Sequence, residues 1–79
     1  MDLPTQTIRD AIKEVHTAVQ YEEISLVLKI NLGENRRNQI LKRSTKDALN
    51  YCSYNEIRLM RSLLSTDVFA DFELQPVNA

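Results

Sequence analysis

Apolar residues near the start of the chain recur with the period of an α-helix. From Thr7 onward they are three and four residues apart, which places them on one stripe of a helix. Thr7 stands three residues before Asp10, a spacing that suits a helix N-cap. We therefore predict an amphipathic helix after Thr7 whose buried stripe comprises Ile8, Ala11, Ile12, Val15, Ala18 and Val19.

The pattern of residues 24–32 fits either a strand or a helix. Apolar and polar positions alternate, as in a half-buried strand, except at Val27. As a helix, the same segment turns Ile24, Val27 and Leu28 inward and ends near residues 29–31. A strand needs a partner, and the other alternating segment is residues 68–75. We expect an all-α bundle of about four helices, with an α+β fold containing strands near 24–32 and 68–75 as the alternative.

Residues 34–52 predict an amphipathic helix with a basic outer side. At about 100° per residue, its inward half carries Tyr51, Ser44, Cys52 and a group of apolar residues. That apolar group is Ile40, Leu41, Ala48 and Leu49. The outward half carries Asn35, Arg36, Gln39, Lys42, Arg43 and Lys46, whereas Arg37 points toward the apolar side in the first turn.

A further helix is predicted from Ser53 to about Leu64. Ser53 and Glu56 have the spacing of a capping box, and Ile57, Met60, Leu63 and Leu64 line one side. Leu59 widens this stripe, which suggests contact with a second surface. The next apolar group includes Phe69 and Phe72 and precedes Pro76. We predict one helical domain over residues 1–75, a frayed tail at 76–79, and an interface of Leu59, Leu63, Phe69 and Phe72.

Composition restricts the setting in which the protein acts. The 79 residues include one cysteine, Cys52, so neither an internal disulfide nor a Cys/His zinc cluster is expected. The start of the chain lacks the pattern of a secretory leader, and its longest purely apolar run is three residues. We expect a cytoplasmic protein without a membrane contact. Because a chain of this length has a small core, we also expect a homodimer.

Charge is unevenly distributed along the chain, although the net charge is only −1. Residues 29–46 carry six cations against one acid, while both flanking regions are acidic. Cations can bind phosphates, and interleaved amides can contact base edges. The predicted DNA-binding residues are therefore Asn35, Arg36, Arg37, Gln39, Lys42, Arg43 and Lys46.

Several short motifs resemble a known DNA-binding family. Leu3-Pro4, then residues 21–25 with the sequence Tyr-Glu-Glu-Ile-Ser, then Gly33, are similar to region 4 of sigma-70-type factors. The resemblance covers about residues 3–43 and implies a helix-turn-helix. It makes residues 21–28 the support helix, residues 29–31 the turn, and the segment after Leu32 the recognition helix. The chain departs from the family pattern at Lys29 in the turn and lacks the apolar anchors of the recognition helix.

Groups for catalysis are few. His16 is the single imidazole and has no nucleophile near it in sequence, and Cys52 is expected to be a buried, inert thiol. No phosphate loop or metal-ligand spacing is present, so we predict neither an enzyme nor a cofactor nor a metal. The first functional hypothesis is a small DNA-binding transcriptional regulator. The alternative is a protein-interaction adaptor or inhibitor, of the phage or plasmid type, that binds a partner protein.

Overall fold

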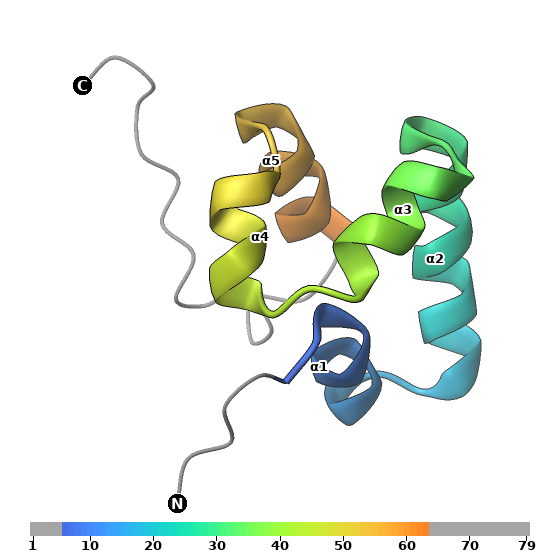
Figure 1. Ribbon diagram of the computed structural model, residues 1–79. Helices are drawn as coiled ribbons and strands as arrows, with labels where there is room; N and C mark the ends of the chain where they lie inside the picture. Colours follow the sequence, from blue (N-terminus) through green and yellow to red (C-terminus); the bar gives the residue numbers. More distant parts are fainter. Residues whose placement is uncertain (1–5, 64–79) are drawn as a thin grey trace, which may run out of the picture.

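The computed structural model describes residues 6–63, which form five helices joined by short linkers (Figure 1). Their bounds are α1 Ile8–Val15, α2 Ala18–Leu32, α3 Glu34–Leu41, α4 Thr45–Tyr51 and α5 Tyr54–Leu63. These helices hold 83% of the described residues, and no strand occurs among them. The predicted all-α class is confirmed. The strand alternative is wrong for residues 24–32, which lie in α2, and its partner at 68–75 lies outside the described residues.

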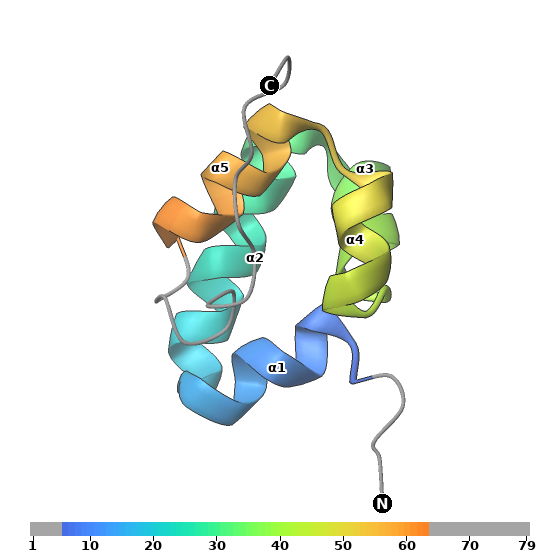
Figure 2. The same ribbon diagram turned by 90° about the vertical axis from the view of Figure 1, so that its left-hand side faces the viewer.

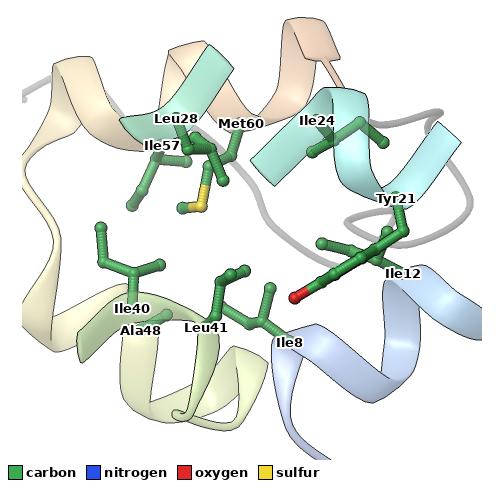
Figure 3. Packing of buried hydrophobic residues seen from close by; sticks show 10 residues of the cluster. All are labelled: Ile8, Ile12, Tyr21, Ile24, Leu28, Ile40, Leu41, Ala48, Ile57 and Met60. Carbon is green, nitrogen blue, oxygen red and sulfur yellow. The ribbon is translucent and has the colours of Figure 1, made fainter. Parts of the chain in front are cut away.

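The helices form two layers with α1 across one end. Figure 2 shows α2 and α5 on one side and α3 and α4 on the other, with α1 closing the lower end. Ten apolar residues lie between these layers (Figure 3): Ile8, Ile12, Tyr21, Ile24, Leu28, Ile40, Leu41, Ala48, Ile57 and Met60. All five helices therefore contribute to one core.

A capping box divides the predicted first helix in two. The Thr17 side chain accepts from the backbone N–H of Gln20 at 3.1 Å, and Gln20 accepts from the backbone N–H of Thr17 at 2.8 Å. Because this box starts α2, α1 ends at Val15. Of the predicted buried stripe, Ile8 and Ile12 are buried and Ala11 is half-buried, whereas Val15 at the end of α1 and Ala18 and Val19 in α2 are exposed. The predicted cap at Thr7 is confirmed, since its hydroxyl accepts from the backbone N–H of Asp10.

The chain turns between α2 and α3 at one residue, Gly33. Its φ of 93° lies in the region that favours glycine, and its N–H closes α2 by donating to the carbonyl of Lys29 at 2.8 Å. The turn predicted at residues 29–31 is wrong, because the helix continues through them to Leu32. The reason is local: Gly33 can adopt the positive φ that ends the helix, and residues 29–31 include no glycine.

The predicted basic helix over residues 34–52 is also interrupted. α3 ends at Leu41, and the Ser44 hydroxyl starts α4 by accepting from the backbone N–H of Asp47 at 3.1 Å. In the linker, the carbonyl of Arg43 accepts from the backbone N–H of Ile8 at 2.7 Å. This bond ties the linker to the start of α1. The break changes the phase of the helix, so Leu49, predicted to face inward, is 41% exposed.

The predicted capping box at Ser53 is confirmed and starts α5. The Ser53 hydroxyl accepts from the backbone N–H of Glu56 at 3.1 Å, and Glu56 accepts from the backbone N–H of Ser53 at 2.8 Å. In α5, Ile57 and Met60 are buried as predicted. Leu64 and the predicted tail at 76–79 lie outside the described residues.

Candidate nucleic-acid interface

The predicted DNA-binding side chains do not share one helix or one face. The chain breaks between α3 and α4, and the predicted residues lie in different places. Arg36 and Arg43 lie at Tyr51, Arg37 lies beside α2, and a third set is exposed. The exposed ones are Asn35, Lys42 and Lys46. The candidate site must therefore be assembled from contacts between helices.

Arg36 of α3 and Arg43 of the α3–α4 linker both lie against the ring of Tyr51, the last residue of α4. The Arg36 guanidinium lies 4.2 Å from the ring centroid and that of Arg43 lies 3.6 Å from it. Arg43 also donates to the backbone carbonyl of Gln39. Guanidinium groups stack favourably on aromatic rings. These two cations thus contribute to packing α3 against α4.

Arg36 is further held by an ion pair with two hydrogen bonds. Its Nε donates to Glu56 Oε2 at 2.7 Å and its Nη2 donates to Glu56 Oε1 at 2.8 Å. Nη2 also donates to the carbonyl of Tyr51 at 3.0 Å. Such paired bonds are the strongest form of an arginine–carboxylate contact. They tie α3 to α5 and engage the Nε and Nη2 donors of Arg36.

This ion pair shifts the pKa of both partners. The hydrogen bond to Arg36 lowers the pKa of Glu56, and the hydrogen bond to Glu56 raises the pKa of Arg36. Beside them, burial raises the pKa of the Cys52 thiol to about 11, and the Glu56 charge adds to that effect. Cys52 is therefore protonated at neutral pH, which agrees with its interpretation as an inert thiol.

Arg37 points away from this group and lies beside α2. Its Nη1 donates to the hydroxyl of Ser25 at 3.1 Å, and its Nε donates to the side-chain oxygen of Asn38 at 3.1 Å. The Glu34 carboxylate lies 3.8 Å from Nη2 and is 63% exposed, so this ion pair is weak. The hydrogen bonds of Arg37 thus go to neutral side-chain oxygens of Ser25 and Asn38.

An open, polar cavity of about 320 Å³ adjoins Arg37. It is lined by residues of three helices: Arg9, Lys13, Tyr21, Glu22, Ser25, Arg37, Asn38 and Leu41. Three of these residues are cations and one is an acid. Positive charge from α1 and α3 therefore meets at one concave surface.

Tyr21 holds the two α1 cations in this cavity. Arg9 Nε donates to the Tyr21 hydroxyl at 3.1 Å, and Lys13 Nζ lies 4.9 Å from the centroid of the same ring. Both contacts leave the charges without a carboxylate partner among the described residues. Sequence reasoning missed Arg9 and Lys13. Each of them follows a buried isoleucine, Ile8 or Ile12, by one residue. The four-residue spacing places Arg9 and Lys13 on the same side of α1, but it does not indicate which other helix lies against that side.

The residues predicted to form an interface, and His16, lie outside this cavity or outside the described residues. Leu59 and Leu63 are partly buried against the core, and Phe69 and Phe72 lie outside the described residues. Nε2 of His16 is covered and has no hydrogen-bond partner within residues 6–63. In the same range, no group of three or more metal-ligating side chains occurs. None of the five described helices combines the length and the hydropathy that a membrane span requires.

Comparison with known proteins gives no relative for this chain: no protein-family model, no curated protein and no solved structure matches it.

Proposed function

We propose that the protein is a small, non-enzymatic transcriptional regulator that binds duplex DNA through a basic surface built from α1 and α3. We define this α1–α3 surface as Arg9, Lys13, Arg37, Asn38 and Lys42. The observation that carries the proposal is that three cations from two helices line one open polar cavity. The surface replaces the continuous basic helix expected from the sequence.

The chemistry of these residues suits contact with phosphates. Arg9 and Arg37 donate to neutral side-chain oxygens, so their charges are available to an anion. Lys42, the C-cap residue of α3, follows Asn38 by four residues and is exposed. An amide between two cations can contact a base edge while the cations bind the backbone. Arg36 and Arg43 act instead in packing at Tyr51.

Salt-dependent DNA binding of matched variants tests this proposal. Fluorescence anisotropy with a labelled duplex compares the wild type, Arg9→Ala/Arg37→Ala, and the control Arg58→Ala/Arg61→Ala, which removes the same charge from α5. We expect the first variant to bind about tenfold more weakly or worse and to lower the salt slope by about 2, because each cation releases roughly one counterion.

The control separates a local surface from a general effect of charge. We expect it to keep the wild-type slope. Equal slopes for the two double variants would show that these cations do not form the binding surface. A wild type that fails to bind duplex at about 50 mM salt would overturn the DNA-binding function itself.

We include in this proposal a cytoplasmic location, where the single thiol of Cys52 stays reduced, and association into a homodimer. A symmetric regulator would bind two half-sites on its operator.

A protein-interaction module remains the second candidate, and the acidic residues of α1 and α2 favour it. Asp10, Glu14, Glu22 and Glu23 are all exposed, and neither ion pair within residues 6–63 involves them. Capture of one stoichiometric protein that survives nuclease treatment, and is lost on Glu14→Lys/Glu23→Lys, would favour this function. The same variant would leave a DNA-binding surface at Arg9 and Arg37 in place.

A further inference from the structure

Helix α2 has an apolar stripe on the side opposite the core. Tyr21, Ile24 and Leu28 are buried, whereas Val19, Leu26 and Ile30 are 68%, 53% and 72% exposed. At about 100° per residue, the three exposed residues lie within an arc of about 40°. We call Val19, Leu26 and Ile30 the α2 stripe. Large apolar side chains gathered on one exposed helix face are typical of a contact surface.

Charged residues border the α2 stripe on both sides. Glu22 and Lys29 lie along one edge, and Glu23 lies along the other. Glu22 and Lys29 are seven residues apart, about 10 Å along the helix, which is too far for an ion pair within α2. Among the described residues, none of the three takes part in an ion pair. The stripe therefore presents an acid and a base at opposite ends of one edge.

We propose that the α2 stripe is the contact surface of a symmetric dimer, in which α2 packs antiparallel against α2 of a second copy. In an antiparallel pair related by a two-fold axis, like edges of the two helices face each other. With the axis between the levels of Ser25 and Leu26, Glu22 of each copy lies opposite Lys29 of the other. Two identical ion pairs then form on the same edge.

The same register also matches the apolar residues. Leu26 lies beside Leu26 of the second copy at the axis. Val19 of one copy and Ile30 of the other lie about two residues apart along the helix, within about 3 Å in axial position. The contact is thus apolar at its centre and charged at its edge, as protein interfaces commonly are.

A parallel arrangement is disfavoured by the same residues. In a parallel pair, opposite edges face each other at equal levels, so Glu22 of one copy would lie beside Glu23 of the other on both sides. Like charges at close range are repulsive. The charges bordering the stripe therefore favour the second copy in the antiparallel direction. This inference does not depend on DNA binding.

Sedimentation equilibrium of the full chain at concentrations up to millimolar tests the dimer. We expect a reversible monomer–dimer equilibrium, and we expect Leu26→Glu to raise the dissociation constant about tenfold or more, because it places a charge at the apolar centre. The control Leu49→Glu makes the same change at an exposed leucine of α4 and should leave the constant unchanged. A wild type that is monomeric throughout, or equal effects of both variants, would overturn the proposal.

Charge reversal tests the register. Glu22→Lys and Lys29→Glu should each weaken the dimer about tenfold, because each turns two attractive pairs into two repulsive ones. The double variant Glu22→Lys/Lys29→Glu should recover the wild-type constant. Without this recovery, the antiparallel register is wrong.

Disulfide trapping tests the direction of the helices independently. In a Cys52→Ser background, Leu26→Cys should cross-link rapidly, because the axis passes beside residue 26. Val19→Cys should not, since the two copies of residue 19 lie about 20 Å apart in this register. Cross-linking of both variants at equal rates would indicate parallel helices and contradict the proposed arrangement. Circular dichroism of every variant shows whether it retains the helical fold.

Discussion

At the scale of single residues, Tyr51 and Glu56 determine what two of the arginines do. Tyr51 lies between the Arg36 and Arg43 guanidinium groups, and Glu56 binds Arg36 through two hydrogen bonds. Replacing these arginines would loosen the packing of α3 on α4 and α5. A loss of DNA binding in such variants would therefore combine the effect of lower stability with that of a lost DNA contact. Arg9 and Arg37 are the better positions to replace for this reason.

The ion pair makes stability depend on pH in a defined direction. The pKa of Glu56 is lowered in the folded protein, so its stabilising contribution is present above the unfolded pKa of about 4.5 and is lost as pH falls through the folded pKa. We expect Glu56→Gln to lower Tm by about 3–6 °C at pH 7 and to have a smaller effect at pH 3. Thermal unfolding followed by circular dichroism measures both.

A matched variant on α3 controls for the loss of any carboxylate. Glu34 lies 3.8 Å from Arg37 but is 63% exposed, whereas Glu56 is 14% exposed. Glu34→Gln should change Tm by less than about 2 °C at either pH. If Glu56→Gln kept the wild-type dependence of Tm on pH between 6 and 3, the ion pair would not be the source of that dependence.

At the scale of elements, short polar motifs decide where the helices begin. Thr17, Ser44 and Ser53 each accept a hydrogen bond from the backbone N–H three residues later. All three residues suit a cap, but the sequence pattern predicts a helix start only at Ser53. Thr17 lies within an apolar period that continues to Val19, and Ser44 lies within an apparently continuous amphipathic helix. A local cap outweighs a continuing period because it satisfies helix N–H groups that would otherwise lack partners.

Gly33 contributes to stability through the backbone conformation that it adopts between α2 and α3. Gly33→Ala should lower the free energy of unfolding by about 1–2 kcal/mol, because a side chain is disfavoured at a φ of 93°. Apart from Gly33 itself and its two neighbours in the chain, no residue has an atom within 4 Å of the added Cβ position, so the cost comes from the backbone conformation and not from a clash. Urea unfolding measures the change.

A chemically synthesised chain with D-alanine at position 33 is the matched control. A D-residue accommodates positive φ, so this chain should be at least as stable as the wild type. Equal losses with L- and D-alanine would contradict the conformational explanation.

At the scale of the whole molecule, two layers enclose one small core. Ten buried apolar residues connect all five helices, and the bond from Ile8 to the carbonyl of Arg43 joins α1 to the α3–α4 linker. This joining brings Arg9 and Lys13 to the same cavity as Arg37. The candidate site is therefore a product of helix packing, and it depends on the integrity of the core.

Truncation of a core residue should consequently unfold a substantial share of the molecules. Leu28 is fully buried between the layers, so Leu28→Ala should cost about 2–5 kcal/mol, out of a total near the low end of about 5–15 kcal/mol for a domain of this size. Leu49→Ala, at an exposed leucine of α4, should change stability by less than about 0.5 kcal/mol. Urea unfolding of both variants makes the comparison. Similar losses would show that Leu28 does not lie in a closely packed core.

Local patterns in the sequence are sufficient to predict the helical class, the caps at Thr7 and Ser53, and the burial of two residues each in α1 and α5, because caps and apolar periods act within a few residues of the chain. Which charged side chains come together depends instead on how the helices pack. Arg36 and Arg43 are adjacent to Arg37 and Lys42 in sequence, yet they pack at Tyr51, while Arg9 and Lys13 join Arg37 from a distant segment. Charge interactions depend on distances in space, and those distances are set when apolar faces of separate helices pack together.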